Sequence, residues 1–225
     1  MPLQNLTMTN VSIRCLLALC GVAAVLPLPA TAAPDTDSVA LHLAAQGFGA
    51  WPGRVDFGNN IGRDGQLDLA RGAALGVQLA RDRGRWRYEL EVQQGRSSLQ
   101  GIRLGTQVGA ADGRATHTAI TGNVYWAFEP WGRAQLRVGV GAGWGRVTLP
   151  RAGFAGGCDC FAATRAQGAA LQARLVGELA LDEGGRPFVQ MGVLSLAGGD
   201  GGQGPVVRYR RDAAWQLGLG WRHTF

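Results

Sequence analysis

The fold of this chain is decided by its last stretch, Trp215-Gln216-Leu217-Gly218-Leu219-Gly220-Trp221-Arg222-His223-Thr224-Phe225. Large, mostly apolar residues occupy alternate positions from Trp215 to Trp221 and return at Phe225, with small or polar residues between them. A period of two is the period of a β-strand whose two faces meet different surroundings. The stretch therefore predicts a strand with one apolar face.

The same alternation recurs along the chain and predicts about eight strands. They are expected at 39–48, 69–81, 86–93, 118–128, 134–149, 169–181, 188–196 and 215–225. The clearest is 86–93, where apolar and aromatic residues at even positions oppose charged residues and glutamine at odd positions. Both faces of 188–196 are apolar, so its register stays open.

The connections between these strands alternate between long and short. Tight turns are expected at 82–85, 129–133 and 182–186. Long polar or glycine-rich loops are expected at 49–68, 95–115, 150–168 and 197–211. This pattern is typical of a barrel with short turns at one end and long loops at the other. Both mature termini fall at the short-turn end, which we expect in the periplasm.

The first residues have the features of a secretory signal. Arg14 precedes the apolar segment Cys15–Leu28, and the small residues of Pro29–Ala33 offer a cleavage site. We therefore expect a signal peptide at 1–33 and one barrel domain at 34–225. The apolar segment is too short for a spanning helix, and Pro27 and Pro29 break it. No later apolar run approaches about 20 residues, so a closed barrel is the remaining way to cross a bilayer.

The formal net charge of +6 is carried by arginine, because the sequence contains no lysine. The arginines are scattered and form no dense run, which argues against nucleic acid as a partner. We expect them in loops and turns that face anionic lipid headgroups.

Alternation alone does not say which face meets water. A soluble barrel of lipocalin type would place the apolar face inside. The aromatic residues, however, gather near strand ends, as aromatic girdles do at bilayer interfaces. They are Trp86, Tyr88, Trp126, Phe128, Trp221 and Phe225 near one end and Trp144 and Trp215 near the other. The sequence therefore predicts an all-β, eight-stranded antiparallel up-and-down transmembrane β-barrel.

Two adjacent predicted strands carry a more specific pattern. Asn123-Val124-Tyr125-Trp126-Ala127-Phe128, followed by a turn and the glycine-alternating stretch 138–145, resembles the opacity-protein and OmpA-like outer-membrane β-barrel family. The resemblance implies an outer-membrane location in a Gram-negative bacterium. We also expect a monomeric barrel and, because the sequence ends with the barrel, no following peptidoglycan-binding domain. The resemblance also implies that the barrel assembly machinery reads Trp221 and Phe225, although His223 stands where that family usually has an aromatic residue.

Charged residues of both signs fall on the face that this barrel turns inward. An eight-stranded barrel is just wide enough for side chains to fill, and a lone buried charge is costly. We therefore expect a salt-bridged plug, with a narrow or gated ion path as the alternative. The predicted network consists of Arg87, Glu89, Glu91, Arg137, Arg174, Glu178 and Arg222.

Cys158-Asp159-Cys160 lies in an expected extracellular loop. A local disulfide is the first interpretation and a reactive pair is the second. A zinc site would need further ligands, and no histidine lies nearby in the sequence. The remaining cysteines, Cys15 and Cys20, would leave with the signal peptide.

Two kinds of function remain open: a structural or surface-interaction (adhesin-like) barrel, and a small porin or narrow ion channel. A lipid A-modifying enzyme is less favoured, because His42, His117 and His223 have no serine at a close same-face spacing. We expect no cofactor or metal. The loops would carry recognition, with outer-membrane lipid, lipopolysaccharide phosphates, anionic glycans or a host surface as candidate ligands. The expected recognition residues are Trp51, Arg54, Phe57, Arg208, Tyr209, Arg210 and Arg211.

Overall fold

The computed structural model describes residues 35–59, 61–154, 157, 159–181, 184–202 and 205–225. These residues belong to one compact unit, Ala33–Phe225. The expected signal peptide lies outside the described residues. The strands are β1 Thr36–Phe48, β2 Ala50–Asp56, β3 Gly62–Arg83, β4 Trp86–Leu104, β5 Gln107–Ala127, β6 Ala134–Leu149, β7 Thr164–Leu179, β8 Gly185–Leu196, β9 Asp200–Gly201, β10 Val206–Tyr209 and β11 Asp212–Thr224.

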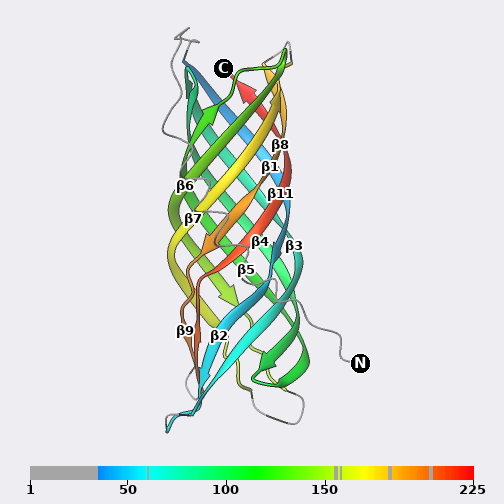
Figure 1. Ribbon diagram of the computed structural model, residues 1–225, viewed down its shortest axis with the longest axis vertical. Coiled ribbons are helices and arrows are strands. Elements are labelled where there is room, and N and C mark those ends of the chain that lie inside the picture. Colours follow the sequence, from blue (N-terminus) through cyan, green and yellow to red (C-terminus); the bar gives the residue numbers. More distant parts are fainter. Residues whose placement is uncertain (1–34, 60, 155–156, 158, 182–183, 203–204) are drawn as a thin grey trace, which may run out of the picture. The chain divides into compact units, whose positions relative to one another are not determined.

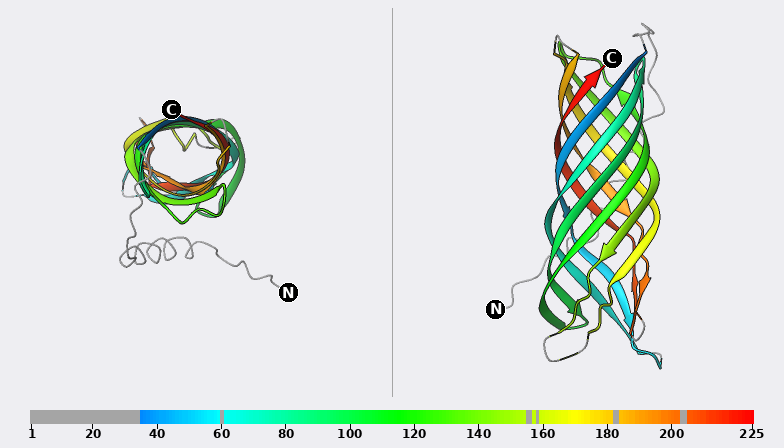
Figure 2. Two further views of the ribbon diagram at one scale, coloured as in Figure 1. Left: turned by 90° about the horizontal axis from the view of Figure 1, so that it is seen from above. Right: turned by 180° about the vertical axis from the view of Figure 1, so that it is seen from behind.

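The long strands form a closed antiparallel ring (Figure 1). The order is β1, β11, β8, β7, β6, β5, β4 and β3, and β3 pairs again with β1. The view along the axis in Figure 2 shows this ring from above. The all-β, eight-stranded, up-and-down class predicted from the alternation is therefore confirmed. No helix among the described residues is long and apolar enough to cross a membrane.

The two ends of the barrel differ. One end carries the chain's residue 225 and the short turns at Gly84–Arg85 and 128–133; we call it the tight-turn end. Gly84 has a φ of 58°, a left-handed conformation that glycine adopts without a Cβ penalty. The opposite end, which we call the extended end, carries β2, β9, β10 and the outer halves of β3, β4 and β5 (Figure 1).

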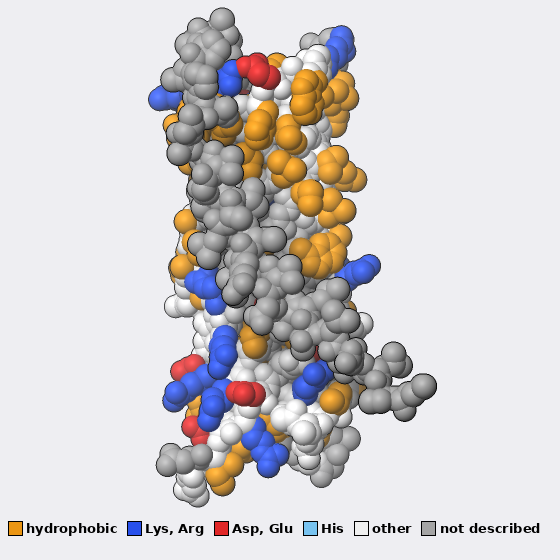
Figure 3. All heavy atoms as spheres, in the orientation of Figure 1, with side chains coloured by type: hydrophobic (Ala, Val, Ile, Leu, Met, Phe, Trp, Pro, Cys, Tyr) orange, Lys and Arg blue, Asp and Glu red, His pale blue; other side chains and the backbone are white. Residues whose placement is uncertain are grey.

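A belt of exposed apolar residues surrounds the barrel next to the tight-turn end. On the face seen in Figure 3, the hydrophobic side chains gather over the upper part, and arginines with a few acids lie below them. We call this set the apolar belt. Its largest exposed members include Leu41, Leu43, Leu75, Val77, Leu79, Trp86, Tyr88, Leu90, Val92, Ile120, Val124, Val140, Trp144, Leu171, Leu175, Val189, Met191, Trp215, Leu217, Leu219 and Trp221.

The belt settles the question of which face points outward. Inside the belt, most interior side chains are charged or amide-bearing, beside a small buried cluster of Ala40, Tyr125, Val176 and Phe188, which is the reverse of a soluble lipocalin-like barrel. The open register of β8 is also fixed, because Phe188 and Gln190 point inward and Val189 and Met191 outward. An outward apolar face around a polar interior is the pattern of a barrel that sits in lipid.

The polarity pattern inverts at the extended end. In β4, the inward face runs from Glu91 and Gln93 to Leu99, Ile102 and Leu104. The interior there is one hydrophobic cluster drawn from several strands and the segment 150–163. Its largest fully buried members are Trp51, Leu67, Ile102, Leu149, Phe161, Leu194 and Leu196. This half of the molecule is therefore built like a soluble β-barrel, with its apolar side chains inside.

All four expected long loops are thus wrong in whole or in part. Residues 49–68 form β2, a turn and the start of β3, and 95–115 form most of a hairpin between β4 and β5. Residues 197–211 contain β9 and β10, which pair with each other and through β10 with β2. Of the expected loop 150–168, residues 164–168 belong to β7, and 150–163 has no strand in its described part apart from the bridge Ala152–Phe161. The outer halves of β3, β4 and β5 were missed because register shifts at 68–72 and 99–101 break the local period of two.

Candidate functional site: the polar lumen and its cap

The lumen inside the apolar belt is filled by inward side chains from every strand of the ring. Alternation places one inward side chain every second residue, so neighbouring strands stack polar groups at similar heights. All members of the expected network are at most 5% exposed. They are Arg87, Glu89, Glu91, Arg137, Arg174, Glu178 and Arg222.

Glu178 is the centre of the contacts nearest the tight-turn end. Its Oε2 accepts from Arg87 Nη2 at 3.0 Å and from Arg137 Nε at 3.3 Å. Its Oε1 accepts from Arg222 Nε at 3.2 Å and is also paired with Arg87 Nη1. Arg87 is held from its other side by Asp82, with Nε to Oδ1 at 2.7 Å and Nη2 to Oδ2 at 2.9 Å. The carboxylate of Glu178 thus contacts three arginines, and the carboxylate of Asp82 binds the most buried of them, Arg87.

Glu91 organises a second group deeper in the barrel. Arg174 donates from Nη2 to Glu91 Oε1 at 2.8 Å, and Gln172 donates to Oε2 at 3.2 Å. His42 Nε2 lies 2.8 Å from the same Oε1, and its Nδ1 lies 2.9 Å from Gln190 Nε2. Since the amide of Gln190 donates to Nδ1, the proton of a neutral imidazole stands on Nε2 and is donated to Glu91.

Glu89 joins the two groups. It accepts from Arg222 Nη2 at 2.9 Å and from the Tyr125 hydroxyl at 3.1 Å. Asn123 bridges further, with Nδ2 at 3.2 Å from Glu89 Oε1 and 3.4 Å from Glu91 Oε2. The network is therefore continuous across the lumen. Its arginines, Arg87, Arg137, Arg174 and Arg222, are matched by Asp82, Glu89, Glu91 and Glu178.

Sequence reasoning missed several members of this network, among them His42, Asp82 and Tyr125. Asp82 was assigned to a turn, but it lies on β3 with 7% exposure. The alternation places His42 and Tyr125 inward, yet no local signal pairs them with partners 49 and 36 residues away. Gly76 leaves room for the imidazole, because a Cβ there would collide with His42 Nε2.

A layer of amides lies beyond the charges. Gln216 donates to Gln93 at 3.3 Å, and Gln46 donates to Ser97 Oγ at 3.4 Å. The hydrophobic core of the extended end follows this layer and caps the lumen. The lumen is therefore occupied in three successive zones: charges, amides and an apolar core.

His117 lies at the edge of this core. Its ring packs edge-on against Phe48, with centroids 5.8 Å apart. Its Nε2 has no hydrogen-bond partner among the described residues. Burial lowers the pKa of His117 from 6.5 to about 4, so this histidine is neutral at physiological pH.

The expected recognition residues of the extended end divide into two groups. Trp51 and Tyr209 were expected in exposed loops and are instead buried, with Trp51 Nε1 donating to the Arg210 carbonyl at 3.0 Å. They were misassigned because β2 and β10, which carry them inward, were not recognised as strands. The other members are exposed: Arg54, Phe57, Arg208, Arg210 and Arg211.

One cysteine of the expected pair, Cys160, lies among the described residues. Cys160 is fully buried and takes part in a disulfide. Cys158 lies outside the described residues. Between them, Asp159 is paired with Arg151 at 3.3 Å on the surface.

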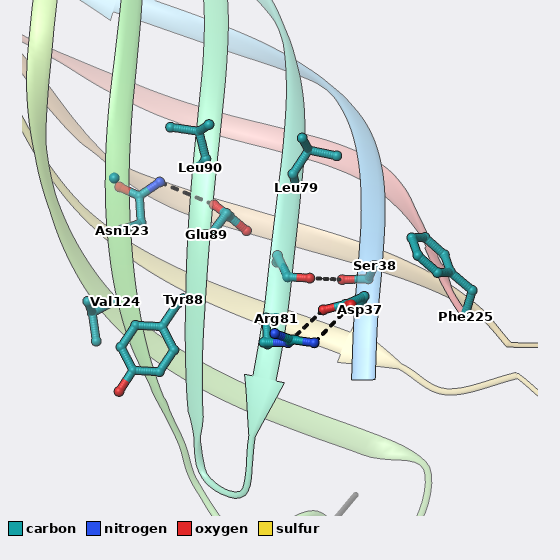
Figure 4. A pocket seen from close by; sticks show the side chains of 12 residues that line it. Asp37, Ser38, Leu79, Arg81, Tyr88, Glu89, Leu90, Asn123, Val124 and Phe225 are labelled. Atoms are coloured by element: carbon teal, nitrogen blue, oxygen red, sulfur yellow. Dashed lines mark hydrogen bonds and ion pairs between the residues drawn. The ribbon is translucent and has the colours of Figure 1, made fainter. Parts of the chain in front are cut away.

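The tight-turn end holds an open groove of about 670 Å³ on the barrel wall (Figure 4). Leu79, Leu90, Val124 and Phe225 line it, and Asp37 pairs there with Arg81. Phe225 is 73% exposed and Trp221 51% exposed, so both expected assembly residues face outward. The groove is a feature of the lipid-facing wall and contains no group placed for catalysis among its lining residues.

Solved structures with this architecture exist. The neisserial surface protein A is 11% identical, with 87% of this chain and 100% of that chain covered and a TM-score of 0.50. The outer membrane protein AlkL is 15% identical over 89% and 96% of the chains, also at 0.50. The outer membrane protein OprG from Pseudomonas aeruginosa is 14% identical over 84% and 96%, again at 0.50. This chain has the fold of the eight-stranded outer-membrane β-barrels. No protein-family model and no curated protein sequence matches the chain.

Proposed function

We propose that this protein is an outer-membrane β-barrel of a Gram-negative bacterium that acts at the cell surface through its extended end and does not conduct solutes. The observation that carries the proposal is the inversion of polarity along the barrel. A lipid-facing belt around polar side chains gives way to a water-facing wall around an apolar core. A wall of the second kind is stable in water and presents a rigid surface above the membrane.

The orientation follows from the same asymmetry. In outer-membrane barrels the short turns face the periplasm and the longer connections face outward. The tight-turn end of this barrel would then lie in the periplasm with both mature termini, and the extended end would stand outside the cell. The assembly machinery would read the closing strand β11, where Trp221 and Phe225 face outward.

A monomeric barrel fits the closure of the sheet. β1 pairs with β11 from Ser38 to Phe48 and with β3 from Thr36 to Gln46. Through the belt, the ring therefore offers no free strand edge to a second copy.

The filled interior argues against the alternative, a small porin. The charge network, the amide layer and the apolar core each close the lumen at a different height. A conducting path would have to separate buried ion pairs, which costs several kcal/mol for each uncompensated charge. A structural or surface-interaction role makes no such demand.

A catalytic role has no support in the arrangement of the described residues. His42 is occupied by Glu91 and Gln190, and His117 is enclosed by the core. No group of three or more histidine, cysteine or acidic side chains among the described residues is arranged to hold a metal ion.

Tag insertion tests the location and the orientation together. A short epitope after Gly105, in the tight turn between β4 and β5, lies at the extended end. The same epitope after Gly84, between β3 and β4, lies at the tight-turn end and is the matched control. We expect antibody to label intact cells carrying the first insertion and to label the second only after permeabilisation. The reverse result, or a soluble periplasmic product, would overturn the proposal.

The surface-interaction role has its own test. Apolar side chains stand exposed at the tips of the extended end: Phe57, Ile61 and Val108, at 38%, 57% and 68%. Replacing all three by serine leaves the buried core intact. We expect cells displaying the variant to attach less well than cells displaying the native protein to surfaces coated with host-matrix protein. Equal attachment by cells with and without the native protein would contradict an adhesin-like role.

A further inference from the structure

Three exposed arginines just beyond the belt differ in their partners from the exposed arginines Arg81 and Arg83 at the tight-turn end. At the tight-turn end, Arg81 pairs with Asp37 at 2.9 Å, and Arg83 reaches Asp35 at 3.4 Å. Just beyond the belt on the other side, Arg71, Arg96 and Arg114 have no ion pair among the described residues. An excess of unpaired positive charge attracts anions. These three arginines therefore lack the acidic partner that Arg81 and Arg83 have at the tight-turn end.

These three arginines line one pocket of about 330 Å³ on the outer wall. They come from three neighbouring strands, β3, β4 and β5, which place Ala73 opposite Arg96 and Ser98 opposite Arg114. The rest of the lining is Gly72, Ala73, Ser97 and Ser98, and it includes no carboxylate.

The height of the pocket follows from the alternation. Arg71 is the second outward residue beyond the belt residue Leu75, and Arg96 is the second beyond Val92. Arg114 lies slightly farther out, beyond Ile120 on β5. The guanidinium groups thus begin where the exposed apolar side chains end, which is the level of lipid headgroups around a barrel in a bilayer.

The chemistry of the pocket fits a phosphate group. A guanidinium offers a planar fork of donors that matches phosphate oxygens, and such charge-assisted bonds are stronger than neutral ones. Small residues between the arginines leave space for the group itself, and the Ser98 hydroxyl can donate to it.

We propose that Arg71, Arg96 and Arg114 form a binding site for a phosphate group of a glycolipid headgroup in the outer leaflet. The proposal rests on the membrane location and orientation proposed above. Such a site would give this face of the barrel a specific lipid contact. It would also account for three exposed arginines that line one pocket with no carboxylate among them.

The test uses the full-length mature protein refolded into phosphatidylcholine vesicles. Four additions are compared: phosphorylated lipid A, the same glycolipid after removal of its phosphates, inorganic phosphate, and a sulfated polysaccharide. The readout is the urea midpoint of unfolding, followed by tryptophan fluorescence. The variants are R71Q/R96Q/R114Q and the matched control R63Q/R103Q/R165Q, which removes the same charge from exposed arginines outside the pocket.

We expect phosphorylated lipid A to raise the midpoint of the native protein and of the control variant, and the dephosphorylated lipid to leave it unchanged. The pocket variant should need at least about tenfold more phosphorylated lipid for half of the shift, since one charge-assisted contact is worth about a factor of ten. The shift should shrink with added salt, because the site is exposed.

Three results would overturn the proposal. If phosphorylated lipid A shifts the midpoint of the pocket variant as it shifts that of the native protein, the three arginines are not the binding site. Inorganic phosphate alone could give the full shift, which would remove the lipid as the source. A sulfated polysaccharide could give the shift where the lipid does not, which would assign the pocket to a glycan. Failure to fold into any vesicle, seen as the absence of a heat-modifiable band, would overturn the membrane location as well, whereas folding without a lipid response overturns the site alone.

Discussion

Glu178 shows how a single residue sets the properties of this interior. Its two oxygens meet Arg87, Arg137 and Arg222, and none of the four side chains is more than 3% exposed. Taking an ionic group out of water costs several kcal/mol, and only partners with good geometry repay that cost. The network is therefore most sensitive at the residue with the most partners.

We expect the substitution Glu178→Gln to lower the free energy of unfolding by about 3–5 kcal/mol, because it leaves buried arginines without their shared anion. Glu129→Gln is the control. Glu129 pairs with Arg85 on the surface at 70% exposure, and its loss should cost less than about 1 kcal/mol. Urea unfolding in lipid vesicles measures both. Equal effects of the two substitutions would show that the buried network does not stabilise the barrel.

The lowered pKa of His117 predicts how the stability of the folded protein depends on pH. Its pKa is about 4 in the folded protein and 6.5 in the unfolded chain. Between these values the unfolded state binds a proton and the folded state does not, so stability falls as the pH drops from 6.5 towards 4. Asp212 acts in the opposite sense, since burial raises its pKa from 3.8 to about 6 and stability falls as the pH rises through that range.

The contribution of His117 is isolated by comparison with the substitution His117→Gln. We expect the difference in unfolding free energy between native and variant protein to change with pH only between 6.5 and about 4, with the native protein losing stability there. Urea unfolding at a series of pH values measures the difference. A difference that is constant across this range would contradict a neutral, buried His117.

At the scale of the element, β11 tests the outward assignment of the belt. Leu219 points outward with 66% exposure, in the middle of the strand. We expect Leu219→Arg to cost about 2–4 kcal/mol, as a charge does at a lipid-facing midplane position. Ala213→Arg places the same charge outward beyond Trp215 and should cost about 0–1 kcal/mol. Refolding and unfolding titrations in vesicles compare the two, and a cost at Ala213 equal to that at Leu219 would contradict the position of the belt.

At the extended end the inward face of a strand is apolar and the outward face is polar. We therefore expect a new acidic residue to be harmful on the inward face and tolerated on the outward face. Ile102 is fully buried in the apolar core, and its neighbour Arg103 points outward. Ile102→Asp buries an unpaired charge in an apolar site, so we expect it to open the extended end locally. Limited proteolysis should then cut between 95 and 115 in this variant while the heat-modifiable band persists. Arg103→Asp should remain resistant, and cleavage of both variants at one rate would show that no such core exists.

The strands of the belt could be predicted because each carries its own signal. In β4 and β11 the period of two is unbroken, so strand type, inward face and outward face all follow from the local sequence. The alternation also assigned seven charged residues to the inward face, and the structure places them inside the barrel. The partners of each charge could not be read from the chain, because they come from strands distant in sequence.

The strands of the extended end carry no such signal. Register shifts between Leu99 and Gly101 and between Asp68 and Gly72 move the inward face by one position, so apolar residues on one face fall out of period. β2 and β10 are short and depend on each other across about 150 residues. Their stability comes from tertiary pairing and from the shared core, which propensity does not report.

At the scale of the whole molecule, one continuous sheet is suited to two different surroundings along its length. Its belt faces lipid and keeps its charges inside, and its extended end faces water and keeps its apolar side chains inside. The change of polarity takes place within continuous strands such as β3, β4 and β5. The consequence is a lumen that is filled from the tight-turn end to the extended end.

Single-channel conductance in planar lipid bilayers tests this filled lumen most directly. The purified protein is refolded and inserted, and current is recorded at neutral pH under an applied voltage. We expect no stable openings, because buried ion pairs, amides and the apolar core occupy the lumen at successive heights. Steady openings of the size seen with porins would contradict it.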